Sequence, residues 1–134
     1  MRKSAALYGL VALGTSIGGT FRALASFLPV GAFWFPWTTL FVNVVGSFVI
    51  SVYATLAGPD GRLMSSTRQR HFVMTGFCGG FTSFSIFSVE TVRFLQSGQP
   101  ARAALTVVVS VAAWLVAAWL GHLLAWRLNR PGGR

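Results

Sequence analysis

Acidic residues are almost absent from this chain. Among its 134 residues there are 2, Asp60 and Glu90, against 11 Lys and Arg. A catalytic carboxylate pair, a Ser-His-Asp set or a metal cluster cannot be assembled from these residues. The single cysteine, Cys78, excludes an intramolecular disulfide and fits no cysteine-based metal motif. We therefore expect that the protein is not an enzyme and has no catalytic residues.

Charged residues of both signs are scarce. They form 10% of the chain, and 54% of the residues are hydrophobic, whereas a soluble domain carries about 25% charged residues. Four apolar runs have about the ~20 residues that a bilayer helix needs. The sequence predicts an all-α integral membrane protein, with residues 1–134 forming one four-helix membrane domain. The predicted spans are 5–28, 38–56, 72–95 and 103–126.

The net charge of +9 comes from basic residues at the ends of the predicted spans, so we expect no nucleic-acid partner. Arg93 and Arg102 fall on one side of the membrane, and Arg22 lies near that side. The eight on the other side are Arg2, Lys3, Arg62, Arg68, Arg70, Arg127, Arg130 and Arg134. The positive-inside rule then places both termini in the cytoplasm. Four helices make a poor pore alone, so a dimer in the lipid bilayer is expected.

The third predicted span contains a segment that weakens a membrane helix. Gly79 and Gly80 are adjacent, and a cluster of hydroxyl side chains surrounds them. Interrupted backbone is tolerated in a bilayer only where protein or a water-filled cavity covers it. We predict a break in the third helix near Gly79–Ser83, as part of an ion or substrate site. The freed N–H groups attract anions, and the freed carbonyls can hold a bare cation.

Polar side chains recur at four-residue intervals in two other spans. Thr39, Asn43, Ser47 and Ser51 form one stripe of the second span. A side-chain amide in hydrocarbon is costly without partners, so Asn43 either serves a binding site or forms an interhelical hydrogen bond. Thr106 and Ser110 repeat the spacing in the fourth span, where the hydroxyls can instead bond the carbonyls of their own helix.

Three further features have two interpretations each. Phe84 and Phe87 are spaced to project into one neighbourhood, where electropositive ring edges suit an anion, or they contact lipid. Glu90 is an intramembrane functional acid or forms an interfacial ion pair with Arg93. Small residues from Gly14 to Gly19 suit a dimer contact or packing within the chain.

The residues of the third span resemble a known family. Gly79-Gly80-Phe81-Thr82-Ser83-Phe84-Ser85-Ile86-Phe87-Ser88-Val89-Glu90 is similar to the Gly-Gly-x-Thr-Thr-Phe-Ser-Thr-Phe-Ser-x-Glu signature of the Fluc fluoride channels. The segment from Thr39 to Phe48 resembles the second-helix motif of that family. Gly14, Gly18, Gly19 and Arg22 resemble its first-helix motif.

The resemblance implies a passive, fluoride-selective channel that exports cytoplasmic fluoride across the inner (plasma) membrane. It implies a homodimer of antiparallel subunits with two pores, and a structural sodium ion at the dimer centre. The sodium ligands would be backbone carbonyls of Gly79 and Thr82, and Arg22 would help form a vestibule. The implied fluoride pore residues are Asn43, Phe84, Phe87, Thr39, Thr106 and Ser110.

Several residues depart from the family pattern, and two other functions compete with a channel. Ala23 and Thr106 stand where the family usually has Tyr, and Ser83 and Ile86 replace threonines. The bias of positive charge does not favour antiparallel insertion. The alternatives are a small proton-coupled multidrug exporter, for which Glu90 is the only candidate carboxylate, and a membrane assembly subunit that transports nothing.

Overall fold

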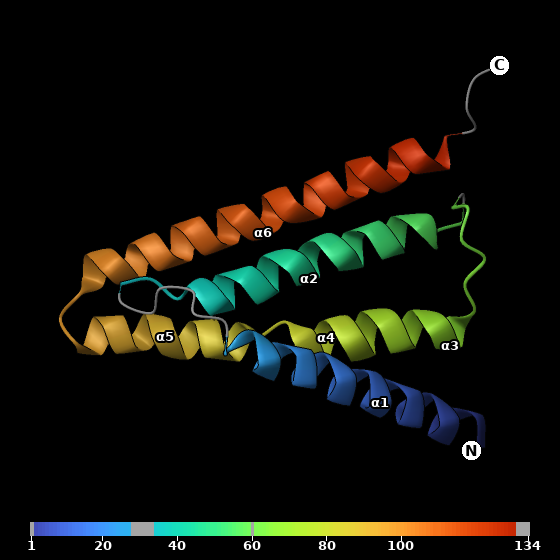
Figure 1. The fold of residues 1–134 in the computed structure, drawn as a ribbon, viewed down its shortest axis with the longest axis horizontal. Helices are drawn as coiled ribbons and strands as arrows, with labels where there is room; N and C mark the ends of the chain where they lie inside the picture. Colours follow the sequence, from blue (N-terminus) through green and yellow to red (C-terminus); the bar gives the residue numbers. More distant parts are fainter. Residues whose placement is uncertain (1, 28–33, 60, 131–134) are drawn as a thin grey trace.

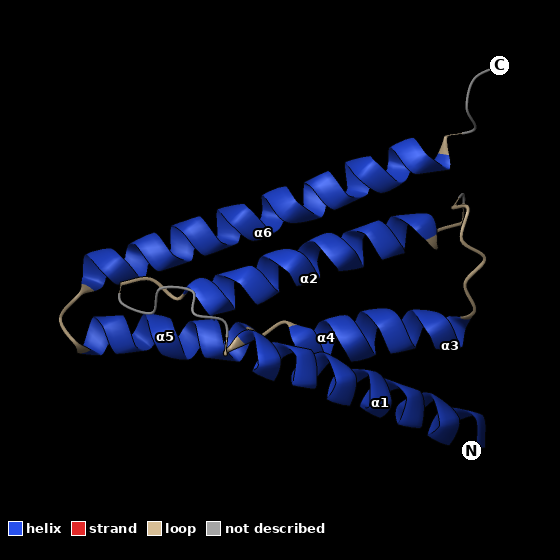
Figure 2. Cartoon of the chain, viewed as in Figure 1, coloured by secondary structure: helices blue, strands red, loops and turns tan. Residues whose placement is uncertain are grey.

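Four long helices make up the described part of the chain. The computed structural model describes residues 2–27, 34–59 and 61–130, and within these ranges every regular element is helical (Figures 1 and 2). The elements are α1 (Arg2–Ala25), α2 (Trp37–Leu56), α3 (Thr67–Arg70), the π-helix η1 (His71–Cys78), α4 (Gly79–Phe81), α5 (Phe84–Gln96) and α6 (Pro100–Asn129). Elements α3 to α5 follow one another as the third span. The described residues thus contain 4 helices long and apolar enough to cross a membrane, as expected for a multi-pass membrane protein.

The helices differ from the predicted spans mainly at their ends. The third span begins at Thr67 rather than at residue 72, because Ser66 and Gln69 form a capping box that starts the helix in a polar segment. The fourth span begins at Pro100, a residue suited to the first helical turn. The first helix ends at Ala25, while the predicted end at residue 28 and Asp60 lie outside the described residues.

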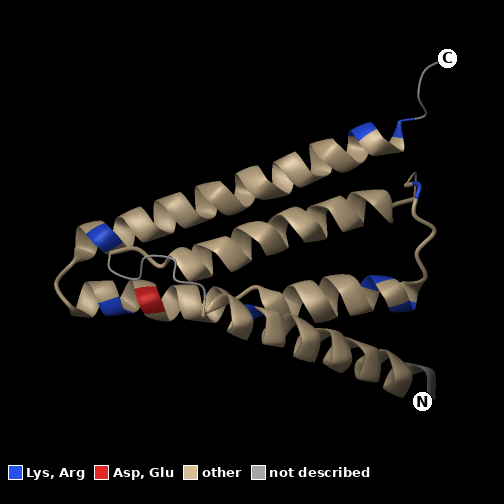
Figure 3. Ribbon diagram, in the orientation of Figure 1, with Lys and Arg blue, Asp and Glu red and all other residues tan. Residues whose placement is uncertain are grey.

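The third span lies between α1 and the other two helices (Figure 1). Helix α2 packs mainly against α6, α1 packs against η1 and α4, and α5 packs against α6. The start of α1 and the end of α6 lie at one end of the bundle, as four crossings require (Figure 1). Most of the coloured basic residues gather at that same end (Figure 3).

Glycine allows α1 to lie directly on the third span. A Cβ atom at Gly14 would lie 2.6 Å from the carbonyl oxygen of Phe72 and 3.0 Å from Cα of Gly76. A Cβ at Gly80 would meet the backbone of Thr15. At Gly14 the small residues of the first span therefore serve packing within the chain. This favours intramolecular packing over a dimer contact for this segment.

The third span changes its helical geometry before it breaks. The N–H of Gly79 donates to the carbonyl of Met74, the five-residue spacing of a π-helix. The helical conformation is lost at Thr82, with ψ 159°, and at Ser83, with φ −148° and ψ 107°. The break thus falls within the predicted range, but the glycines themselves remain helical. Gly79 and Gly80 lie in α4, and the interruption follows directly at Thr82 and Ser83.

Candidate functional site

The backbone at the break is satisfied by a side chain of another helix. The N–H of Ser83 donates to Oδ1 of Asn43 over 2.8 Å, and Nδ2 of Asn43 donates to the carbonyl of Ser83 over 3.2 Å. In an unbroken helix the N–H of Ser83 would donate to the carbonyl of Gly79. Asn43 therefore forms an interhelical hydrogen-bond pair, one of its two expected roles. One of its amide N–H groups remains beyond this pair.

Arg22 of α1 holds the other side of the break. Its Nη1 atom donates to the carbonyl of Thr82 over 3.1 Å. The Thr82 hydroxyl and N–H both donate to the carbonyl of Cys78, over 2.9 and 3.0 Å. Ser83 Oγ accepts a hydrogen bond from the N–H of Ile86 and caps the start of α5. Protein groups from three spans thus cover the interrupted backbone, which a bilayer requires.

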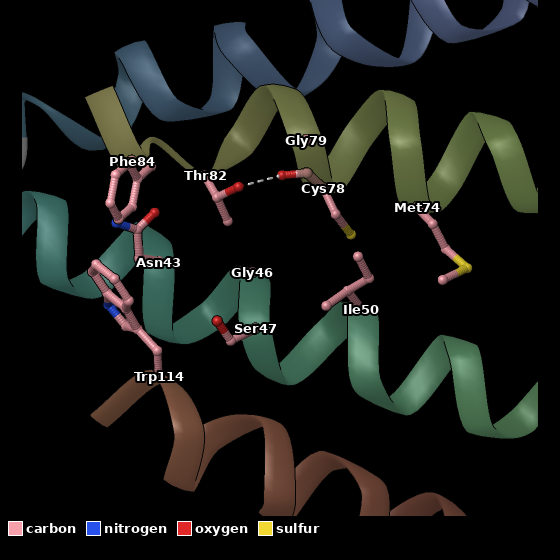
Figure 4. Close-up of a pocket in the computed structure, with 10 residues that line it drawn as sticks. All are labelled: Asn43, Gly46, Ser47, Ile50, Met74, Cys78, Gly79, Thr82, Phe84 and Trp114. Atoms are coloured by element: carbon pink, nitrogen blue, oxygen red, sulfur yellow. Dashed lines mark hydrogen bonds between the residues drawn. The ribbon is translucent and has the colours of Figure 1, made fainter. Parts of the chain in front are cut away.

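A cavity of about 260 Å³ lies beside the break. Figure 4 shows its residues, which come from α2, from the third span and from α6. Asn43, Thr82 and Phe84 lie near one another at one part of the cavity, with the Trp114 indole reaching toward them from α6. The ten lining residues are Asn43, Gly46, Ser47, Ile50, Met74, Cys78, Gly79, Thr82, Phe84 and Trp114. None of these residues is acidic or basic, so the cavity holds polar groups without a fixed charge.

Three aromatic rings meet at this site. The ring centroids of Phe84 and Phe87 are 5.5 Å apart, and those of Phe87 and Trp114 are 4.9 Å apart with an interplanar angle of 74°. Phe84 is 71% exposed and Phe87 is 6% exposed, so one ring lies at the surface of the single chain and the other inside it. Phe81 is not part of this group, because it stacks on Phe77. The expected proximity of Phe84 and Phe87 is therefore present.

A second cavity, of about 370 Å³, collects the charged residues of the site. Arg22, Thr39, Ser83 and Glu90 are among its lining residues. The Thr39 hydroxyl donates to Oε1 of Glu90 over 2.9 Å, while the buried Oε2 atom has no hydrogen-bond partner among the described residues. Neither oxygen is hydrogen-bonded to Arg93 in that part of the chain. The structure thus places Glu90 beside Thr39 in a cavity that Arg22 also lines, without a hydrogen bond to Arg93 among the described residues.

The predicted residues of the fourth span are buried but line neither cavity described above. Thr106 is 1% exposed and Ser110 is 2% exposed, both on α6. The Thr106 hydroxyl has no hydrogen-bond partner among the described residues. The predicted pore residues therefore divide into three groups: Asn43 with the two phenylalanines, Thr39 beside Glu90, and the two hydroxyl residues of α6.

The two residues whose carbonyls are expected to bind a cation stand at the two ends of α4: Gly79 is its first residue and Thr82 follows its last. Gly79 and Thr82 both line the first cavity. The Gly79 carbonyl is released from its helical donor because the N–H of Ser83 donates to Asn43. A Cβ at Gly79 would meet only the carbonyl of Met74, at 3.9 Å, so the space beside Gly79 is open. The Thr82 carbonyl accepts one hydrogen bond from Arg22 and keeps a second lone pair.

Comparison with known proteins assigns the chain to a family. The model of the family described as CrcB-like protein, Camphor Resistance (CrcB), matches residues 9–122. The chain belongs to the CrcB-like family. A protein of Rhodopseudomonas palustris (strain BisB18), named fluoride-specific ion channel FluC 1, is 56% identical over 99% of this chain and 96% of its own length. A protein of Paramagnetospirillum magneticum named fluoride-specific ion channel FluC is 49% identical over 92% of this chain and 98% of its own length.

One residue of this CrcB-like site was missed by the sequence analysis. Trp114 lies four positions after Ser110 and eight after Thr106, so it continues their stripe on α6. The spacing could have indicated it, but a tryptophan in an apolar span is ordinarily read as packing or as an interfacial residue. Its contact with Phe87 and its place in the first cavity appear only in the folded chain.

Proposed function

We propose that this CrcB-like protein is a fluoride-selective ion channel, through which fluoride leaves the cytoplasm passively down its electrochemical gradient. The observation that carries the proposal is the uncharged cavity beside the helix break, which holds the Asn43 amide and the Phe84 ring. Two relatives match nearly the whole chain, and their names support the same ion. The proposed membrane is the inner (plasma) membrane, where such export would lower intracellular fluoride.

The chemistry of the cavity suits a small anion. Asn43 has an N–H group beyond those that hold Ser83, and the edges of Phe84 and Phe87 carry positive partial charge. The N-terminus of α5, at Phe84, adds the positive end of a 13-residue helix. These groups replace part of the lost hydration of the ion without a fixed charge that would trap it. Thr39, Thr106 and Ser110 would extend the path, and Arg22 and Glu90 would line its vestibule.

The assembly that we propose is a homodimer of antiparallel subunits with two pores. In the single chain the Phe84 ring is 71% exposed, and the cavity beside the break also includes Asn43, Ser47 and Thr82. Polar side chains at membrane depth need protein or a water-filled cavity around them, and a second copy packed over this face would shield the cavity and the Phe84 ring from lipid. Inverted copies would also place the basic end of one subunit beside the less basic end of the other.

A sodium ion at the centre of the dimer fits the carbonyls of the break. Gly79 presents a carbonyl without its helical donor, next to open space, and Thr82 keeps one lone pair. Two carbonyls of one chain are too few for a hard cation, whereas the same two from a second copy would bring the number to four. The ion would hold the two breaks together and add positive charge near the path.

Fluoride efflux from liposomes tests the proposal. Purified protein should release fluoride rapidly when the membrane potential is dissipated, without a pH gradient, because a channel couples to no proton. Phe84→Ile should slow the efflux roughly tenfold or more, since it removes the electropositive ring edge. Phe41→Ile is the matched control, because Phe41 is 46% exposed on α2 and is absent from the lining of both cavities.

Two other outcomes would contradict the proposal. Efflux that requires a pH gradient and is lost in Glu90→Gln would identify a proton-coupled exporter. No efflux from folded protein would leave a membrane assembly subunit. The names of the relatives give the exporter no support.

A further inference from the structure

The indole N–H of Trp114 is a hydrogen-bond donor for which the described residues provide no acceptor. Nε1 of Trp114 is buried and has no hydrogen-bond partner among the described residues. A buried donor without a partner destabilises the folded state, and buried tryptophans usually find a partner for this group. An unsatisfied group of this kind in a native structure calls for an explanation, such as a ligand that is bound in the working state.

The surroundings of the indole indicate what that ligand would be. Trp114 lines the uncharged cavity together with Asn43 and Phe84 and meets the Phe87 ring nearly at right angles. An indole N–H can donate but cannot accept, so it serves an anion or another acceptor and not a cation. Figure 4 shows the indole reaching from α6 toward Asn43 and Phe84.

The position of Trp114 on α6 extends this argument along the helix. Thr106, Ser110 and Trp114 follow one another at four-residue intervals, so successive donors are about 6 Å apart along the axis. Nε1 of Trp114 and Oγ1 of Thr106 are both buried without partners among the described residues. Of these three side chains, Trp114 is the one that lines the cavity beside the break.

We propose that Trp114 is an anion-binding residue of the fluoride path, where its indole N–H donates a hydrogen bond to the ion beside Asn43 and Phe84. The inference rests on the proposed function, because it takes fluoride as the anion. The competing explanation is packing alone, in which the N–H faces the Phe87 ring as a weak hydrogen bond to the aromatic face.

Trp114→Phe tests this role, because it keeps an aromatic ring and removes the N–H. Its fluoride efflux should be roughly tenfold slower than that of the unmodified protein, as expected when one hydrogen bond to an ion is lost. Trp119→Phe is the control on the same helix, since Trp119 is 60% exposed, and its efflux should be unchanged. In ¹⁵N-labelled protein the Trp114 indole resonance should shift on fluoride titration and show a ¹H–¹⁹F coupling.

Two results would overturn the role of Trp114 and leave the channel in place. One is efflux through Trp114→Phe at the rate of the unmodified protein; the other is a Trp114 indole resonance that does not respond to fluoride while the unmodified protein conducts. If Trp114→Phe does not fold, the indole resonance of the unmodified protein decides alone. Absence of fluoride efflux from the unmodified protein would instead refute the proposed function, and this inference with it.

Discussion

Replacing Asn43 with leucine removes the side chain that holds the helix break. Leucine has a similar volume, so the principal loss is the hydrogen-bond pair between Asn43 and the backbone of Ser83. The N–H of Ser83 then remains in a buried, water-poor position without a partner, whereas its carbonyl, at the N-cap of α5, keeps the first intrahelical bond. In separated helices the same backbone groups can return to an unbroken helix, so the substitution lowers the stability of the packed state alone.

The size of the effect follows from the number of orphaned groups. A buried group without a partner costs about 1–3 kcal/mol, and the Ser83 N–H is the one group left so, which means that Asn43→Leu should lower the free energy of unfolding by about 1–3 kcal/mol. Asn129 is a matched control because it makes the same pair of bonds, accepting from the N–H of Arg62 and donating to the carbonyl of Thr55, each over 3.0 Å. The bond to Arg62 is exposed, so water can replace it, and Asn129→Leu should cost less than about 1 kcal/mol.

The free energy of unfolding of both variants can be measured in detergent micelles. The mole fraction of sodium dodecyl sulfate is increased, and unfolding is followed by tryptophan fluorescence. The fluoride efflux of Asn43→Leu should be lost as well, because the break and the free N–H are both altered. Equal destabilisation by Asn43→Leu and Asn129→Leu would refute the reasoning, since it would mean that burial at the break adds nothing to the value of these bonds.

Three other perturbations test the packing, the cation and the topology. Gly80→Ala should lower the midpoint of unfolding because its Cβ meets the backbone of Thr15, whereas Gly19→Ala, with nothing within 4 Å, should be neutral or slightly stabilising; equal effects would count against the close packing of α1. Replacing sodium with a large organic cation should slow fluoride efflux or loosen the dimer, and no change in either would argue against a structural sodium ion. A cysteine introduced as Ser97→Cys should react from both sides of the membrane in about equal amounts if the two orientations are both present. Native Cys78 is 2% exposed, so it should not contribute to the labelling. Reaction from one side alone would exclude inverted copies.

The sequence predicted the spans well where hydrophobicity alone defines them. The second helix, Trp37–Leu56, differs from its predicted range by one residue. The third span began earlier than predicted because Thr67 to Arg70 is a polar segment whose helix start depends on the capping box at Ser66. That capping pattern was visible in the sequence, whereas the π-helix that follows was not. Its five-residue spacing occurs where the third span packs against α1 and α2.

The sequence identified which residues lie at the site better than it identified their hydrogen-bond partners. Asn43, Phe84 and Phe87 were expected near the break, and they lie there. The amide of Asn43 could be identified as costly, but its partner could not, because a single sequence does not say which backbone group it faces. Gly79 and Gly80 were interpreted as weakening the helix, whereas both are helical and Gly80 lets α1 approach the third span. The same limit hid Trp114, whose unsatisfied N–H becomes apparent only from its neighbours.

The break in the third span also has a consequence for the order of synthesis. The side chains that hold it, Arg22 and Asn43, belong to α1 and α2, which leave the ribosome before the third span. Because chains are made from the N-terminus, both partners are already in the membrane when Thr82 and Ser83 arrive. The interrupted segment therefore never has to wait in lipid for a later helix to satisfy its backbone. A rearranged chain that began at the third span would lose this advantage during biogenesis, even if its finished structure were the same.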